Sequence, residues 1–383
     1  MSGESHKSVI NAPAPGLLIT LFSDSLFRGC SDGQIYICHQ GGINSSWLAF
    51  GNLAVYSMTK HNWYLCTESR LAQQFSEYIA PFWHEHVVQG YFRGNGDISV
   101  SYAYCVPEHA KQSVLISSGR IESLLKYKEV IYELYRNGFA VFVLDHRGQG
   151  LSGRMTVNLH QGYIDDFQHY VDDMCHFIDK IVTPHQRGAL NLLCHSMGSA
   201  IGALTILQRP TQFNRVVFGS PMFGIRPALP EWLAKALIGL NRCANWLLPG
   251  SSGYFFGQRD YHADDFTVNR LTGSKIRYQL FRNLYAQQPE IQLGGVTPQW
   301  LAAASAAMWQ VEQHAQQITL PVLVFGAGED TVVDNKRQQR VVATMPDAEY
   351  ILVEGARHEI MIETDAIRQP VMTRIFDFFS GEF

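Results

Sequence analysis

The sequence lacks the marks of several protein classes. Charged residues make up 17% of the 383 residues and the formal net charge is −4, which predicts no basic surface for nucleic acid. The seven cysteines form no C-x-x-C pair, so we expect reduced thiols in a cytoplasmic protein and neither disulfides nor a metal site. No apolar run is long enough for a transmembrane helix. The hydrophobic content of 46% instead indicates a globular chain with a large core.

The beginning of the chain differs in character from the rest. Residues 1–57 hold few charges, a short apolar stretch at 17–22 and no sustained periodicity. A signal peptide fits poorly, because the apolar stretch is short, Lys7 is a lone basic residue before it, and no A-x-A-like cleavage site follows. We expect this segment to be either a poorly ordered extension or a translated leader before a start at Met58.

The rest of the sequence alternates between strand and helix patterns. Two alternating stretches, 89–92 and 98–104, flank a Gly-Asn-Gly turn and predict an antiparallel pair. Later apolar runs are continuous and separated by helix patterns, as expected for a parallel sheet with helices on both faces. These runs lie at 114–116, 140–144, 189–193, 216–218, 322–325 and 350–353. We therefore predict an α/β fold with a mostly parallel sheet.

One long segment interrupts this alternation after the run at 216–218. It carries no strand pattern of comparable strength, and its helix patterns cover 231–248, 264–285 and 298–313. Because ligands bind beyond the carboxyl ends of such strands, we predict a helical cap there. The expected domains are a first core part at 58–221, the cap at 222–317 and a second core part at 318–383.

A serine follows the apolar run at 189–193 in the sequence LLCHSMG, residues 192–198. A buried strand that turns sharply into a helix at a serine is the geometry of a nucleophile elbow, G-x-S-x-G. The small residues of that motif allow the strand and the helix to approach closely. Cys194 stands in place of the first glycine, so the match is partial. On its own it fits equally well a serine that merely ends a strand.

Partners for Ser196 follow later strands. A serine nucleophile needs a base to take its proton and a carboxylate to orient that base. On sheets of this kind, serine, acid and histidine follow one another in that order along the chain. Asp330 follows the run at 322–325, and His358 follows the run at 350–353. Ser196, Asp330 and His358 therefore form the candidate catalytic triad.

Neighbouring side chains leave alternatives for parts of this triad. Glu329 and Asp334 compete with Asp330 for the role of the acid. The chain has 15 histidines, so a solvated loop histidine is the alternative interpretation of His358. His195 flanks the serine, but the elbow turns it elsewhere, and we expect it to pack or to make a supporting hydrogen bond.

Two backbone N–H groups are needed to stabilise the negative charge that develops on the attacked carbonyl. Met197, the residue after the serine, supplies the first at the start of a helix. Residues 118–123 form the loop after the run at 114–116, where Gly119 permits a tight turn and the N–H of Arg120 is the expected second donor. A plain glycine-containing turn is the alternative.

Several motifs in order along the chain now point to one family. They are SGRIES at 118–123, Tyr127, DHRGQGLSGR at 145–154, LCHSMG at 193–198, GSPMFGI at 219–225, VVDN at 332–335 and GARHEI at 355–360. Together they resemble the bacterial lysophospholipase L2 family, which is similar to the monoacylglycerol lipase-like α/β-hydrolases. The resemblance covers the chain from about residue 70 to the end. It departs from the family pattern at Cys194, at Ser118, where many relatives have histidine, and in the leader.

The resemblance implies an α/β-hydrolase fold with a helical cap and no metal or cofactor. It implies hydrolysis of lysophospholipids to a fatty acid and a glycerophospho-alcohol. Carried over by position, Ser196 is the nucleophile, Asp330 the acid and His358 the base, with Arg120 and Met197 as oxyanion donors.

Substrate contacts are expected from the oxyanion loop and from the cap. Arg120 is placed to pair with a lipid phosphate, and the alternative is that it pairs with Glu122 or another carboxylate. Glu122 is itself a candidate substrate contact. Trp232, Leu233 and Leu237 are candidates for the acyl-chain site, although packing onto the core explains the same pattern. The cap aromatics also suit peripheral contact with the inner face of the cell membrane.

Two other kinds of function stay open at this stage. The first is a monoacylglycerol lipase or general carboxylesterase. A peptidase that acts on N-terminal proline is possible on the same fold, but nothing in this sequence marks the acidic site that would bind a free amine. The second is a non-catalytic lipid-binding protein, which is disfavoured because all three triad members are present. The expected partner is a lysophospholipid or monoacyl lipid; the sequence leaves the oligomeric state open.

Overall fold

An eight-stranded sheet forms the centre of the protein in the computed structural model, which describes residues 62–247 and 253–381. The spatial order of its strands is β1-β2-β4-β3-β5-β6-β7-β8. β2 runs antiparallel to both β1 and β4, and all other neighbours are parallel, so the predicted mostly parallel α/β sheet is confirmed. The strands are β1 Val88–Arg93, β2 Ser99–Cys105, β3 Gln112–Ser117, β4 Phe139–Leu144, β5 Leu190–His195, β6 Val216–Gly219, β7 Val322–Ala327 and β8 Ala348–Val353.

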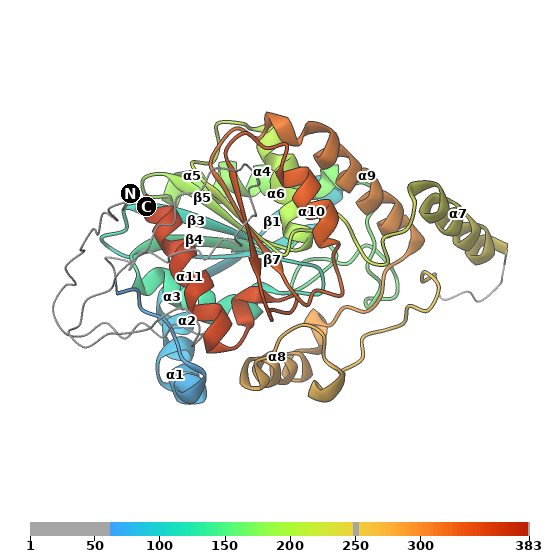
Figure 1. Cartoon of the computed structure of the whole chain (residues 1–383). Helices are drawn as coiled ribbons and strands as arrows, with labels where there is room; N and C mark the ends of the chain where they lie inside the picture. The colour runs from blue at the N-terminus through green and yellow to red at the C-terminus, as the bar shows by residue number, and fades with distance from the viewer. Residues whose placement is uncertain (1–61, 248–252, 382–383) are drawn as a thin grey trace, which may run out of the picture. The chain divides into compact units, whose positions relative to one another are not determined.

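Helices cover both faces of this sheet (Figure 1). Side chains alternate between the faces along each strand, so Leu192 and Cys194 join one apolar core while Leu193 joins the other. The first core is completed by α4, α6, α9 and α10, and the second by α2, α3, α8 and α11. The helices are α1 Leu71–Gln74, α2 Ala80–His86, α3 Lys128–Arg136, α4 Gln168–Phe177, α5 Thr183–His185, α6 Met197–Gln208, α7 Glu231–Leu247, α8 Lys275–Gln287, α9 Pro298–His314, α10 Asn335–Val342 and α11 Asp365–Ser380.

The segment predicted as a cap contains three helices in different settings. α9 packs against α6, and Trp300, Met308 and Val311 are buried in the first core, so this helix belongs to the layer that covers the sheet. α8 begins at Lys275, later than the predicted 264–285 pattern, because Ser274 caps it by accepting from the N–H of Arg277. α7 packs against α9 and lies at the edge of the molecule (Figure 1). α9 therefore lies inside the predicted cap segment 222–317 and packs in the layer on the sheet, and the domain boundaries stay a prediction.

Two further observations concern the sequence-based expectations. In the described residues, no helix is both long and apolar enough to cross a membrane. The expectations for residues 1–57 lie outside the described residues.

Candidate functional site

Ser196 occupies a strained turn between β5 and α6. Its φ of 50° and ψ of −115° place a non-glycine residue in a conformation that is rarely adopted and that persists only where the surroundings impose it. The chain approaches closely here, since a Cβ at Gly198 would overlap the carbonyl oxygen of Ser117. This is the strand–turn–helix geometry that a nucleophile elbow requires.

Cys194 fits the elbow because the helix leaves room for its thiol. A Cβ placed on Gly202 would lie 2.6 Å from Cys194 Sγ, so the sulfur occupies the space that an alanine in α6 would need. Cys194 is fully buried, and burial raises the pKa of its thiol well above the ordinary value. The thiol beside the serine therefore stays protonated and is a packing group.

The three predicted triad side chains meet at the carboxyl ends of β5, β7 and β8. His358 Nε2 lies 3.0 Å from Ser196 Oγ, and His358 Nδ1 lies 2.8 Å from Asp330 Oδ2. All three residues are buried. The sequence order serine, acid, histidine therefore corresponds to a continuous chain of hydrogen bonds.

Asp330 is held as a carboxylate. Its Oδ1 accepts hydrogen bonds from the N–H groups of Val332 and Val333 at 2.7 and 3.0 Å. Burial alone would raise the pKa of Asp330, but the hydrogen bond and charge of His358, together with these N–H groups, lower it below its ordinary value. An ionised Asp330 accepts from the Nδ1–H of His358 and leaves Nε2 free to take the proton of Ser196.

The two alternative acids lie in other settings. Glu329 is exposed to solvent, and Asp334 caps α10 by accepting from the N–H of Lys336 at 3.1 Å. Neither has a hydrogen bond to His358 in the described part of the chain, and this geometry favours Asp330.

The loop after β3 is shaped to present one N–H to the serine. Gly119 lies so close that an added Cβ would be 3.2 Å from Ser196 Cβ, and its own N–H donates to Glu122 Oε2. The next N–H, that of Arg120, has no acceptor within residues 62–247 and 253–381. Met197 begins α6, so its N–H has no acceptor within the helix. These are the two predicted oxyanion donors.

This loop is held in a strained conformation by hydrogen bonds. Ile121 has a φ of 64°, which is costly for a β-branched residue. The Tyr285 hydroxyl donates to the Ile121 carbonyl, and Gln149 Nε2 donates to the carbonyls of Gly119 and Glu122 at 2.8 and 3.2 Å. Such fixed donors need little reorganisation when charge develops during a reaction.

Glu122 supports the loop after β3 through hydrogen bonds and charge contacts of its carboxylate. Its carboxylate lies 2.9 Å from Lys126 Nζ, accepts from the Tyr127 hydroxyl at 2.6 Å and lies 3.1 Å from His195 Nδ1. Burial alone would raise the pKa of Glu122, but Lys126 and His195 hold it well below the ordinary value. The carboxylate of Glu122 therefore has three partners within the protein, and its predicted substrate contact stays a prediction.

His195 connects this carboxylate to the loop that carries His358. Its Nε2 lies 3.2 Å from the carbonyl oxygen of His358. Burial alone would lower the pKa of His195, but Glu122 raises it above the ordinary value, which favours a protonated ring that donates on both sides. The supporting hydrogen bond expected for His195 is present.

Sequence reasoning missed Lys126 and Glu359. Lys126 Nζ lies 2.6 Å from Glu359 Oε1, and the small cavity beside this pair is lined by Glu122, Tyr127 and His195. It holds about 10 Å³, room for roughly one water molecule and not for an acyl chain. The four-residue spacing of Glu122 and Lys126 was a usable signal, whereas nothing in the sequence relates either residue to Glu359.

Arg120 points away from Glu122. Its Nη1 donates to the carbonyl of Gly294 at 2.9 Å, and its guanidinium carbon lies 5.5 Å from the centre of the Trp300 ring. The predicted alternative, an ion pair of Arg120 with Glu122, is absent from the described residues.

The cap candidates are not brought to the triad. Trp232 is 71% exposed, Leu233 and Leu237 are half-buried, and the helix that carries them packs against α9. The structure therefore groups the oxyanion loop with Ser196, Asp330 and His358. The three cap candidates lie on α7, which packs against α9.

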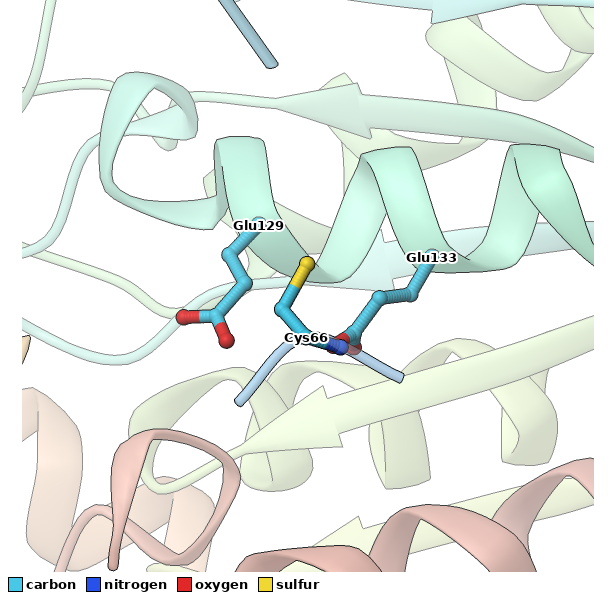
Figure 2. A group of neighbouring side chains, drawn as sticks. All are labelled: Cys66, Glu129 and Glu133. Carbon is cyan, nitrogen blue, oxygen red and sulfur yellow. The ribbon is translucent and has the colours of Figure 1, made fainter. Parts of the chain in front are cut away.

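A second group of polar side chains lies where the segment that precedes α1 meets α3. Figure 2 shows Cys66, Glu129 and Glu133, whose sulfur and carboxylate oxygens are close enough together for metal ligands. Both carboxylates already have strong partners, because Arg368 forms a two-point pair with Glu133 at 2.9 and 2.6 Å, and Arg277 pairs with Glu129. The donor set therefore fits an ion-pair cluster that ties α3 to α8 and α11 better than a metal centre.

Breaking this cluster should destabilise the fold. Glu133→Gln leaves the fully buried Arg368 without its two-point partner, so we expect about 3 kcal/mol lower free energy of unfolding in urea denaturation. Glu349→Gln is the control, because its pair with Arg374 is largely exposed and worth about 1 kcal/mol or less. Equal losses in the two variants would contradict the role of the cluster.

The sheet, the elbow and the loops at its carboxyl edge define an α/β-hydrolase. A family model described as "Serine aminopeptidase, S33" matches residues 108–365. The Escherichia coli lysophospholipase L2 is 34% identical in an alignment of 312 positions that covers 79% of this chain and 90% of that protein. The chain belongs to this hydrolase family and, within it, to the lysophospholipase L2 relatives; it is an ester hydrolase.

More distant proteins share the fold. Rat monoglyceride lipase is 27% identical over 69% of this chain and 81% of its own length. A crystal structure of a soluble variant of Saccharomyces cerevisiae monoglyceride lipase, in complex with a substrate analog, superposes with a TM-score of 0.59. It is 18% identical and covers 76% of this chain and 94% of the yeast chain, so it supports the fold alone.

Proposed function

We propose that this protein hydrolyses the acyl ester of lysophospholipids to a fatty acid and a glycerophospho-alcohol through an acyl-enzyme on Ser196. The observation that carries the proposal is the chain of hydrogen bonds from Asp330 through His358 to Ser196, at 2.8 and 3.0 Å. The similarity of this protein to the E. coli lysophospholipase L2 supports lysophospholipids as the substrate class.

In the proposed reaction, His358 carries the proton at each step. His358 Nε2 takes the proton of Ser196 Oγ as this oxygen attacks the ester carbonyl, and the N–H groups of Arg120 and Met197 bind the oxyanion. The same imidazole then protonates the departing glycerol oxygen. Water attacks the acyl-enzyme by the same route and releases the fatty acid. No step requires a cofactor.

Monoacylglycerol is the second candidate substrate. It carries the same ester on the same glycerol, and rat monoglyceride lipase is a relative. The two substrates differ by the phosphate headgroup, so they are separated by recognition and not by the chemistry at Ser196.

A panel of four substrates tests the proposal. Lysophosphatidylethanolamine, lysophosphatidylcholine and monoacylglycerol with one common acyl chain are compared with a proline amide. We expect the highest kcat/KM on a lysophospholipid and no turnover of the amide. Preference for monoacylglycerol would replace the proposed substrate with the second candidate, and turnover of none of the esters would refute the function.

We also propose that α7 contacts a membrane surface. Its exposed side includes Trp232 and Trp246, which are 71% and 83% exposed, together with Leu240 and Leu247. These positions fall on one side of a helix with 3.6 residues per turn. Tryptophan suits the boundary between lipid and water, which is where a helix of this kind lies on a membrane.

Removing these tryptophans should weaken membrane binding. We expect Trp232→Ala with Trp246→Ala to lower partitioning onto vesicles of phosphatidylethanolamine and phosphatidylglycerol about 10-fold or more, measured by co-sedimentation. Trp309→Ala is the matched control, because Trp309 is 48% exposed on α9. Binding that is unchanged in the double variant would exclude α7 as the contact.

A further inference from the structure

Arg120 carries a guanidinium that has no acidic partner in the described residues, and its backbone follows Gly119, which lies against Ser196. None of the carboxylates in the described residues pairs with it, and its ionisable neighbours are the phenols of Tyr170 and Tyr254, whose own pKa values are raised by burial. Burial lowers the pKa of Arg120 to about 10. A guanidinium that has lost part of its hydration is normally paired, because this loss is costly unless an anion compensates for it. The position therefore calls for an anion that the described chain does not supply.

The neighbourhood holds the guanidinium in place while leaving donors free. Trp300 lies beside it at 5.5 Å, and Nη1 donates to the Gly294 carbonyl at 2.9 Å. An arginine side chain has five N–H donors, and this carbonyl uses one. Arg120 is partly exposed, so its remaining donors are accessible.

The position of Arg120 in the loop fixes which anion it can meet. It follows Gly119, which lies against Ser196, and its own N–H is one of the two proposed oxyanion donors. Any acyl ester bound at Ser196 therefore has its carbonyl at the backbone of this residue. In a lysophospholipid the glycerol carbons alone separate that ester from the phosphate, which is a short distance for an arginine side chain to span.

We propose that the Arg120 side chain binds the phosphate of the substrate and so selects lysophospholipids over monoacylglycerols. This inference rests on the proposed function. The planar guanidinium matches two phosphate oxygens at once, and the charge-assisted bonds supply the missing counter-ion. Glu122 does not compete, because Lys126, Tyr127 and His195 occupy it.

A purely structural role for Arg120 makes a different prediction. In that role, the hydrogen bond from Arg120 to the Gly294 carbonyl would only hold the segment before α9 in position. Arg154 makes a comparable tie, since its Nη2 donates to the carbonyl of Glu290 at 2.8 Å. Arg154→Met is therefore the control for loss of such a tie.

The test compares lysophosphatidylethanolamine with monoacylglycerol of the same acyl chain. We expect Arg120→Met to lower kcat/KM about 10- to 100-fold more for the lysophospholipid than for monoacylglycerol, mainly through KM, and Arg120→Lys to recover part of the selectivity. Glycerol 3-phosphate should inhibit monoacylglycerol hydrolysis by the wild type, and inhibit Arg120→Met more weakly.

The proposal is overturned if Arg120→Met lowers both activities by the same factor, or if Arg154→Met shifts the selectivity equally. Thermal unfolding midpoints identify a variant that has lost its fold, and glycerol 3-phosphate inhibition of the wild type then decides: no inhibition overturns the proposal. A wild type that hydrolyses neither ester refutes the proposed function itself, which is seen before any variant is made.

Discussion

Replacing Ser196 with alanine should lower kcat/KM for ester hydrolysis about 10⁴- to 10⁶-fold. The variant lacks the oxygen that would form the acyl-enzyme, and no neighbouring group takes its place because the Cys194 thiol is buried and protonated. The same change should abolish covalent labelling by a fluorophosphonate probe. Ester turnover and labelling are measured on the same preparation.

Ser199 provides a matched control for this experiment. It lies on the same helix as the elbow, is buried, and has a hydroxyl with no hydrogen-bond partner in the described residues. Ser199→Ala should keep both labelling and turnover. Persistent labelling of Ser196→Ala would show that the nucleophile is another residue.

Replacing Asp330 with asparagine should lower kcat about 10⁴-fold without unfolding the protein. The amide has nearly the shape of the carboxylate, but its NH₂ group can face His358 Nδ1 and favour the tautomer that carries the proton on Nε2. In that tautomer the ring cannot accept the proton of Ser196. Steady-state kinetics, with circular dichroism to confirm the fold, measure the effect.

Glu329→Gln separates the two carboxylates of this loop. Because Glu329 is exposed and has no hydrogen bond to His358 in the described chain, we expect turnover within about 2-fold of the wild type. A loss as large as that of Asp330→Asn would transfer the role of the acid to Glu329.

The sequence was sufficient for the sheet and for the order of the candidate site. Strands such as β5 and β7 are buried on both faces, so their apolar runs are continuous and easily found. Parallel strands end at one edge of the sheet, and side chains placed just beyond them, such as Asp330 and His358, converge there without any local signal connecting them.

The support of the site could not be predicted in this way. The link from Lys126 to Glu359 joins residues far apart in the chain, and it depends on how α3 and the last loops pack. The layer position of α9 was missed for a similar reason, because its apolar face fits the sheet core and a cap equally well until its contact with α6 is known. The periodicity of apolar residues shows which face of a helix is buried, but it does not show which element that face packs against.

The contact between Cys194 and Gly202 has a consequence for reading related chains. Alanine is normally a better helix former than glycine, yet at position 202 its methyl group would collide with the sulfur at 194. The side chains at the two positions therefore compete for the same space. In a chain with glycine at position 194, the closest contact that disfavours alanine at position 202 is absent. The side-chain volumes at these two sites are expected to covary, so that an elbow lacking its first glycine is still recognisable from a glycine in the second turn of the helix.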